Sequence, residues 1–408
     1  MKLENGVFRV QGIDVLELVK TYQTPLYVYD SEIIKRQLDR LKHAFNVPEL
    51  GIHFACKALN NINILRLLKS WGAGLDTVSI QEIWTGIHAG FDPSEIIYTP
   101  NCVGPDEIEM AISLGVQINI DHIETLEYIG QHYPDTKICI RINPHVMAGG
   151  NDKISVGHID SKFGISIYQM PLVERLVKAL KLNINGLHMH TGSDILDPGV
   201  FGLASDILFD VARKFSDLEF IDFGSGLKVP YKEDDVCTDV EEIGEMLSLK
   251  FNQFCSEYGR KLKLFFEPGK YLVSESGFFL VKTNVIKQTP STVFAGVDSG
   301  LNHLIRPMFY GSYHHILNIS NPAGKPRVYN VVGYICETDT FASNRVIPEI
   351  HPGDILCFEN AGAYCFTMSS NYNSRFKPAE VLVHNGAHHL IRNRDTIDDL
   401  LRNQIQVI

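Results

Sequence analysis

Several features that define particular classes of protein are missing from this sequence of 408 residues. The eight cysteines form no Cys-x-x-Cys pair, so neither a zinc knuckle nor a redox dithiol is indicated. No segment holds the ~18 consecutive apolar residues of a membrane span, and the amino terminus lacks the apolar stretch of a signal peptide. Basic runs are missing too, and the net charge of -11 argues against nucleic-acid binding. We therefore expect a cytoplasmic protein that binds small molecules, with neither a membrane nor nucleic acid as a partner.

Two pairs of adjacent histidines, His314-His315 and His388-His389, could suggest a metal site. Neighbours in sequence point to opposite sides of a strand, and no carboxylate at helical spacing accompanies either pair. We therefore predict no metal.

What the chain does contain is a regular alternation of strand-like and helix-like segments between about residues 50 and 270. Short apolar runs of strand length are separated by stretches with helical periodicity, such as Ile62-Leu65-Leu68 and Leu172-Leu176-Leu180. A succession of eight such units fits a (β/α)8 barrel of the TIM type better than an open sheet. The eight runs are Ile52 to Lys57, Leu75 to Ser79, Ile96 to Pro100, Gln117 to Asp121, Ile138 to Asn143, Asn185 to His190, Phe220 to Gly224 and Leu262 to Glu267.

The pattern changes after Ser276, where runs rich in Val, Ile, Phe, Tyr and Gly replace the helical periodicity. We predict an α/β barrel over residues 26–275 and a β domain, a sandwich or small barrel, made of residues 1–25 and 276–408. The first helix of the barrel is expected near residues 32–44. The strand-like residues 6–10 are expected to pair with the carboxy-terminal sheet.

Polar residues gather at the ends of the barrel runs, where catalytic groups of such barrels lie. Lys57 closes the first run, and an amine buried beside apolar neighbours loses charge stabilisation and can form an imine with a carbonyl compound. The alternative is a lysine at a strand end that simply reaches solvent. The other polar strand ends hold Asp76, Arg141, His188, His190, Ser193, the Gly224-Ser225-Gly226 turn, Glu267 and Lys270.

A phosphorylated carbonyl cofactor fits these strand ends. The Gly224-Ser225-Gly226 turn offers unhindered backbone amides to a phosphate, and Ser193 adds a hydroxyl, although a plain tight turn is the alternative. Pyridoxal phosphate combines such a phosphate with an aldehyde for Lys57, and Glu267 is placed to pair with its ring nitrogen unless it is a solvated acid. One of the two histidines of the sixth run could stack on a flat cofactor, or be a satisfied core residue.

Six motifs resemble those of the diaminopimelate decarboxylase family, in the family's order and over nearly the whole chain. Members of that family are fold type III pyridoxal phosphate enzymes, with an alanine-racemase-like barrel and a carboxy-terminal β domain. The motifs are Phe54-Ala55-Cys56-Lys57, His190-Thr191-Gly192-Ser193, Glu267-Pro268-Gly269-Lys270, Cys336-Glu337-Thr338, Ala361-Gly362-Ala363-Tyr364 and Ser370-Asn371-Tyr372-Asn373-Ser374-Arg375.

The resemblance implies which residues surround the cofactor. They are Lys57 as the Schiff-base lysine, His190 against the ring, Glu267 at the ring nitrogen, Asp76 and Arg141 as charges around the ring, and Ser193, Gly224, Ser225, Gly226 and Tyr364 at the phosphate. For Asp76 and Arg141, a buried ion pair that only braces the barrel is the alternative.

The resemblance also implies a substrate site in the second domain. Arg306 and Tyr310 suit a distal carboxylate, and Glu337 suits a distal ammonium group. Cys336 is similar to the family's thiol that reaches the cofactor from the partner subunit and returns a proton to Cα, or it is an inert buried cysteine. A homodimer with shared active sites is therefore expected. Lys270, which stands where the family commonly has arginine, and Tyr364 complete the implied substrate residues.

The reaction implied is decarboxylation of meso-2,6-diaminopimelate to L-lysine and carbon dioxide through an external aldimine with pyridoxal phosphate, the last step of lysine biosynthesis. One alternative is a related decarboxylase of ornithine, arginine or carboxynorspermidine. Others are a non-catalytic pyridoxal phosphate-binding regulator, and a racemase, which would need an acid-base pair on opposite faces of the ring.

Overall fold

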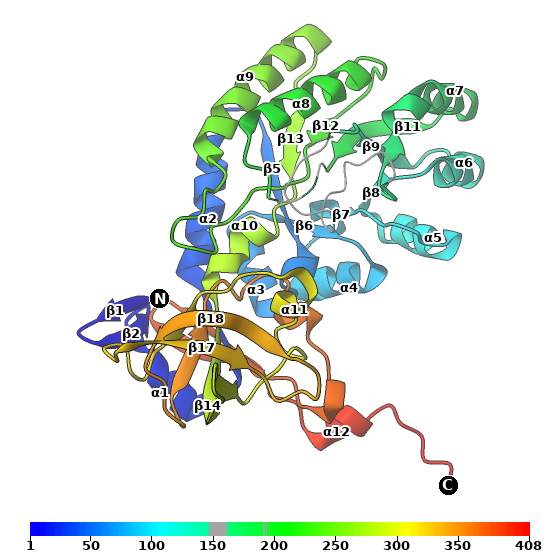
Figure 1. The fold of residues 1–408 in the computed structure, drawn as a ribbon. Helices are drawn as coiled ribbons and strands as arrows, with labels where there is room; N and C mark the ends of the chain where they lie inside the picture. Colours follow the sequence, from blue (N-terminus) through cyan, green and yellow to red (C-terminus); the bar gives the residue numbers. More distant parts are fainter. Residues whose placement is uncertain (147–160, 191, 193) are drawn as a thin grey trace. The chain divides into compact units, whose positions relative to one another are not determined.

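The chain divides into two compact units, seen in the computed structural model that describes residues 1–146, 161–190, 192 and 194–408 (Figure 1). The barrel unit comprises residues 37–229 and 236–271, and the β unit comprises residues 1–36, 230–235 and 272–408. The predicted boundary near residue 26 differs from this division, because residues 26–36 group with the β unit. Among the described residues, no helix has both the length and the apolar character needed to span a membrane.

Eight parallel strands close the barrel unit into a ring, with helices outside them (Figure 1). Each predicted run overlaps one of these strands, so the (β/α)8 barrel is confirmed. A short strand, β10 (Ile165–Ser166), is added beside β9. In ring order the strands are β5 (Leu50–Ala55), β6 (Gly74–Thr77), β7 (Ile96–Tyr98), β8 (Gln117–Ile120), β9 (Lys137–Asn143), β11 (Asn183–Met189), β12 (Phe220–Asp222) and β13 (Lys263–Phe266), which pairs with β5.

The strands are apolar almost throughout because helices cover their outer face. Strands β9 and β11 each bury six of their seven residues. Both example helices are confirmed as α3 (Ile62–Ser70) and α7 (Met170–Leu180), although Leu172 of the predicted apolar stripe is exposed and Val173 is buried instead. The remaining helices of this part of the chain are α2 (Ser31–Ala44), α4 (Ile80–Ala89), α5 (Pro105–Leu114), α6 (Ile123–His132), α8 (Pro198–Ala212), α9 (Val240–Tyr258) and α10 (Lys270–Val273).

The β unit is built on one large sheet. Strand β4 (Leu26–Asp30), buried at all five positions, lies between β14 and β20. Helices α1 (Val15–Tyr22), α11 (Arg306–Tyr310) and α12 (Ile397–Leu401) complete the unit. The sheet runs in the order β18 (Thr340–Pro348), β17 (Pro326–Val332), β15 (Val293–Val297), β14 (Gly277–Gln288), β4, β20 (Ala379–His384) and β21 (Ala387–Arg392), with β16 (Ile316–Asn318) paired to β19 (Ile355–Phe358) and β19 to β14.

The predicted pairing of residues 6–10 with this sheet is wrong. Strand β2 (Val7–Val10) pairs with β1 (Lys2–Glu4) and β3 (Ile13–Asp14) in a separate three-stranded sheet. The reason lies in the two turns, Asn5-Gly6 and Gln11-Gly12, whose four residues all have positive φ. Such two-residue turns join adjacent strands into hairpins, so β2 pairs with its neighbours in sequence and β4 enters the large sheet instead.

Helices α2 and α9 approach each other closely at Gly244. A Cβ at this position would lie 2.2 Å from the backbone oxygen of Ala44, and a backbone atom cannot move aside cheaply. We expect Gly244→Ala to destabilise the chain by about 1–3 kcal/mol, although alanine is the better helix former. At Gly202 of α8 an added Cβ would instead meet the flexible thioether of Met246 at 3.0 Å, so Gly202→Ala should cost little. Melting temperatures followed by circular dichroism check this, and equal values for the two variants would contradict it.

Candidate active site

Polar side chains of three neighbouring strands lie side by side inside the barrel. The register pairs Arg141 of β9 with His188 of β11, and His188 with Asp222 of β12. All three are buried, and each stands within the last three residues of its strand. Because residues in register on parallel strands point to the same face, the three side chains form one cluster at the carboxyl end of the barrel, where barrel enzymes hold their catalytic groups.

Glu267 follows β13 directly and joins this cluster. A carboxyl oxygen of Glu267, one of Asp222 and a ring nitrogen of His188 all lie within 4.8 Å of one another. The Nε2 of His188 is 3.0 Å from Oε2 of Glu267. The other carboxyl oxygen, Oε1, is buried and has no hydrogen-bond partner among the described residues. A ligand that donates a proton could therefore bind to this oxygen.

The cluster separates two carboxyl groups into different protonation states. Burial, followed by the charge of Glu267, raises the pKa of Asp222 well above its ordinary value. Burial alone would also raise the pKa of Glu267, but His188 and then the charges of Lys57 and Arg141 lower it well below its ordinary value. Burial lowers the pKa of His188, so its neutral ring donates the Nε2 proton to Glu267 and offers no lone pair there to a metal. Glu267 is therefore the ionised group and Asp222 the protonated one.

Lys57 lies beyond the end of β5, in the short 3-10 turn Cys56–Ala58 (η1). Its Nζ is 3.7 Å from Oδ2 of Asp76, a buried residue of β6. The expectation that Lys57 is buried is wrong, since its side chain is 46% exposed. The reason is that the strand stops at Ala55, so Lys57 follows the strand rather than ending it. The amine can therefore be reached by a ligand while it stays beside the buried cluster.

Asp76 and Arg141 have different partners. Asp76 pairs with Lys57, and its other carboxyl oxygen is buried without a hydrogen-bond partner among the described residues. Burial, followed by the charge of Glu267, raises the pKa of Asp76 well above its ordinary value. The Arg141 guanidinium lies over the ring of Phe163, 5.0 Å from its centroid. The partner of Asp76 is therefore the candidate imine lysine, which favours a role at the site over a purely structural brace.

The glycine turn after β12 lies against the end of β11. Gly224 and Gly226 have φ of +60° and +141°, and a Cβ on Gly224 would lie 2.7 Å from the backbone oxygen of Met189. The backbone N–H of Ser225 donates to Nδ1 of His190 at 3.2 Å. Burial, followed by the charges of Arg141 and Lys57, lowers the pKa of His190 to about 3, so the ring is neutral near pH 7.

Two further predicted residues of the barrel unit remain. Ser193 lies outside the described residues. Lys270 opens α10, and its Nζ is 2.6 Å from Oδ1 of Asp194. The barrel unit thus brings together one group, made of Lys57, Asp76, Arg141, His190, the Gly224 to Gly226 turn and Glu267.

In the β unit, Arg306 is a buried cation. It opens α11, is 7% exposed and lies 5.7 Å and 5.6 Å from the ring centroids of Tyr231 and Tyr310. Its Nη2 donates to the hydroxyls of Tyr231 and Ser312 at 3.4 Å. Its Nε is buried and has no hydrogen-bond partner among the described residues. A buried guanidinium with a spare N–H is a site for a carboxylate ligand.

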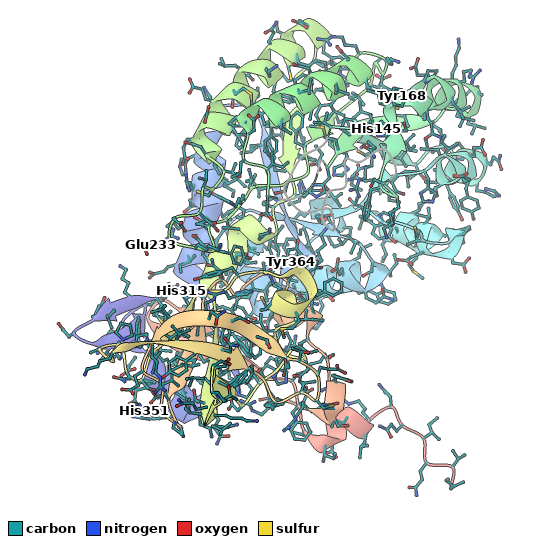
Figure 2. The ribbon with its side chains drawn as sticks, viewed as in Figure 1. His145, Tyr168, Glu233, His315, His351 and Tyr364 are labelled. Carbon is teal, nitrogen blue, oxygen red and sulfur yellow. The ribbon has the colours of Figure 1, made fainter. Side chains whose placement is uncertain are left out.

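The other predicted residues of the β unit lie on loops. Tyr364, labelled in Figure 2, follows β19 in the sequence. Its φ is +56°, which residues other than glycine rarely adopt. Cys336 and Glu337 lie exposed between β17 and β18. Their side chains contact a second loop, since Nδ2 of Asn373 is 3.2 Å from Sγ of Cys336 and the hydroxyl of Tyr372 is 3.1 Å from Oε1 of Glu337.

Sequence reasoning missed three residues with a place in these sites. The sequence predicts a stacking or a core role for His188 but not its contact with Glu267, and it predicts no role for Asp222. A polar side chain inside an otherwise apolar strand was the signal that could have found both. Tyr231 lies beside Arg306, but 75 residues of sequence separate the two, so no pattern in the sequence relates them.

Comparisons with known proteins point to one family. The family model for the pyridoxal binding domain of pyridoxal-dependent decarboxylases matches residues 31–274. The diaminopimelate decarboxylase of Methanothermobacter thermautotrophicus is 42% identical, with 98% of this chain and 96% of the relative covered. The diaminopimelate decarboxylase of Escherichia coli K12 is 35% identical, with 95% of this chain and 95% of the relative covered.

Solved structures give the same result. Diaminopimelate decarboxylase from M. jannaschii superposes with a TM-score of 0.92 at 30% identity, covering 100% of this chain and 98% of that one. The Helicobacter pylori enzyme in complex with L-lysine superposes with a TM-score of 0.88 at 32% identity, covering 95% of this chain and 98% of that one. A lysine/ornithine decarboxylase from Vibrio vulnificus shares the fold alone. Its TM-score is 0.78 at 19% identity, covering 91% of this chain and 98% of that one.

The closed barrel and the match of the family model over residues 31–274 thus define the chain as a pyridoxal-dependent decarboxylase. Within that class, the chain belongs to the diaminopimelate decarboxylase family.

Asp222→Asn should change how stability depends on pH. A carboxyl group with a raised pKa keeps its proton in the folded chain but loses it in the unfolded chain above ~pH 3.9, so folding becomes less favourable as pH rises, by ~1.4 kcal/mol per pH unit. The variant has no such titration. The difference between the melting temperature of the variant and that of the wild type should therefore become more positive from about pH 5 to pH 8.

The control for this measurement is Asp239→Asn, at the exposed amino-terminal cap of α9. Asparagine caps a helix as well as aspartate does, so the melting temperature of Asp239→Asn minus that of the wild type should stay constant over the same pH range. A flat or falling difference for Asp222→Asn would show that Asp222 is ionised in the folded chain.

Proposed function

We propose that this chain decarboxylates meso-2,6-diaminopimelate to L-lysine and carbon dioxide, using pyridoxal phosphate. The observation that carries the choice of substrate is the buried Arg306 guanidinium with its unpartnered Nε. Diaminopimelate has a distal carboxylate to pair with such a cation, whereas ornithine and arginine do not. Binding of L-lysine by the related H. pylori enzyme supports the same reaction.

The residues of the barrel unit fit the cofactor. Oε1 of Glu267 is an unpartnered buried acceptor for the ring N–H, and Lys57 offers an accessible amine to the aldehyde carbon. The turn at Gly224, with no room for a Cβ, lets its backbone approach a phosphate closely. When bound, the cofactor supplies an electron-withdrawing ring that accepts the electron pair left when the carboxylate departs. The ionised Glu267 favours the protonated state of the ring nitrogen on which this withdrawal depends.

The residues of the β unit would select and orient the substrate. Arg306 and Tyr310 would bind the distal carboxylate, Glu337 would bind the distal ammonium group, and Tyr364, together with Lys270 of the barrel unit, would add contacts nearer the phosphate. Fixing the far end of the substrate holds the carboxylate that leaves in one orientation. The Cys336 thiol would then deliver the proton that replaces carbon dioxide at Cα.

We also propose a homodimer that works in the cytoplasm. Cys336 and Glu337 are exposed on the single chain, which supports the idea that they complete the site of a partner subunit. All eight cysteines belong to the described part of the chain and are free thiols, as is usual in a reducing compartment.

The experiment that tests the function compares three substrates. Purified protein with pyridoxal phosphate is incubated separately with meso-diaminopimelate, ornithine and arginine, and carbon dioxide and amine products are quantified. We expect carbon dioxide and lysine from diaminopimelate alone, and none from Lys57→Ala. Turnover of ornithine without diaminopimelate would refute the proposal, as would a change of chirality without gas, which indicates a racemase. Release of no gas from any substrate would indicate a non-catalytic binding protein.

Arg306→Ala should lower kcat/KM for diaminopimelate by about a thousandfold, because the distal carboxylate would lose its buried cation. Arg306→Lys keeps the charge but not the two-pronged geometry, so its loss should be smaller. The exposed arginine Arg327 of β17 serves as the control, and Arg327→Ala should leave kcat/KM unchanged. Steady-state kinetics of lysine formation check this prediction. A loss below about tenfold in Arg306→Ala would place the distal carboxylate elsewhere.

A further inference from the structure

A short turn of the β unit, residues 371–375, holds two consecutive residues of the loop between β17 and β18. The hydroxyl of Tyr372 donates to Oε1 of Glu337 at 3.1 Å. The side-chain amide of Asn373 contacts Cys336, the residue before Glu337. Its Nδ2 is 3.2 Å and its Oδ1 is 3.6 Å from Sγ of Cys336. Neighbouring side chains of one segment thus each hold one of the two adjacent residues proposed for protonation and substrate binding.

The backbone of this turn is strained and well anchored. Asn373 and Ser374 have φ of +56° and +55°, a conformation that carries a steric cost for residues with a Cβ. Anchors hold it in place: Nδ2 of Asn371 donates to the backbone oxygen of Arg375 at 3.0 Å and to Asp395 at 2.8 Å. The Arg375 guanidinium stacks on the ring of Tyr334 at 3.8 Å. Strain that is fixed by its surroundings in this way is typical of functional segments.

An asparagine amide suits a group that changes its protonation state. Its oxygen can accept the S–H of a neutral thiol, and its NH2 group can donate to a thiolate. Both atoms of Asn373 lie within reach of Sγ. The same side chain can therefore keep the sulfur of Cys336 in one place before and after it gives up its proton.

We propose that Asn373 is the positioning residue of the Cys336 thiol. The inference rests on the proposed function, in which the S–H bond breaks, a C–H bond forms at Cα with the electron pair left by carbon dioxide, and the thiolate later regains a proton from water. Asn373 stabilises the sulfur in both states without touching the substrate. Tyr372 holds Glu337 alone and has no part in the proton transfer.

The test compares Asn373→Asp with Tyr372→Phe in the holoenzyme. Both carry Cys102→Ser and Cys237→Ser, because these cysteines and Cys336 are the exposed ones. Aspartate has the size of asparagine and also tolerates a positive φ, so the turn is kept while N–H donors are replaced by a negative charge. The rate of Cys336 alkylation by iodoacetamide, measured by mass spectrometry of the peptide, reports on the thiolate.

Asn373→Asp should slow this alkylation about tenfold, because a like charge disfavours the thiolate, and should lower kcat for diaminopimelate with little change in KM. Tyr372→Phe should leave alkylation unchanged and raise KM, since only Glu337 loses its partner. An alkylation rate in Asn373→Asp equal to that of the wild type would overturn the inference. Equal slowing in both variants would overturn it as well, because it would mean that the turn as a whole had changed.

The failure of the inference can be told apart from the failure of the function. If the wild type released no carbon dioxide from diaminopimelate but Asn373→Asp still slowed alkylation, the function would be refuted and the contact between Asn373 and the thiol would stand. If alkylation slowed while kcat was unchanged, the contact would stand and the positioning role in catalysis would be overturned.

Discussion

The hydrogen bond from His188 to Glu267 decides what the barrel unit can do. Glu267 is buried, and a buried carboxylate without partners would take up a proton. His188 donates to one oxygen at 3.0 Å, and the charges of Lys57 and Arg141 act in the same direction, so the group stays ionised. Its second oxygen, Oε1, has no hydrogen-bond partner among the described residues, so it can accept a hydrogen bond from a cationic N–H. A ring nitrogen placed there gains the charge that decarboxylation requires.

Asp222 shows how the cluster avoids the repulsion of two buried carboxylates. Like charges this close cannot both be ionised at an acceptable cost, so one group takes the proton. Asp222 takes it, because its burial is complete and Glu267 already holds His188. The backbone N–H of Gly224 donates to Oδ1 of Asp222 at 2.7 Å, which ties the protonated group to the start of the turn proposed for the phosphate. The carboxylate proposed for the ring nitrogen and the turn proposed for the phosphate are thereby connected through one side chain.

Much of the fold could be predicted from the sequence, since strands buried on both faces must be apolar throughout and eight such runs alternate with helices. Lys57, Glu267 and the glycine turn were found for the same reason, as polar groups at the ends of apolar runs. The predicted pairing of β2 with the large sheet was wrong because the turns Asn5-Gly6 and Gln11-Gly12 pair this strand with β1 and β3. The exposure of Lys57 depended on where the strand stopped, and boundaries are the least certain part of any pattern.

Contacts between distant loops are what the sequence could not supply. Cys336 and Asn373 are 37 residues apart, and Arg306 and Tyr231 are 75 apart, so no periodicity relates them. Cys336 and Asn373 meet because β17 and β18, and β19 and β20, fix where their two loops begin and end. This divides the chemistry in a physically reasonable way. The residues proposed for the cofactor lie at or just after the ends of stiff strands. Of the residues proposed for the substrate and the proton, Arg306 and Tyr310 lie on the short helix α11, and Cys336 and Glu337 lie on a loop. A strained turn such as residues 371–375 then gives that loop the rigidity that the strands give the barrel.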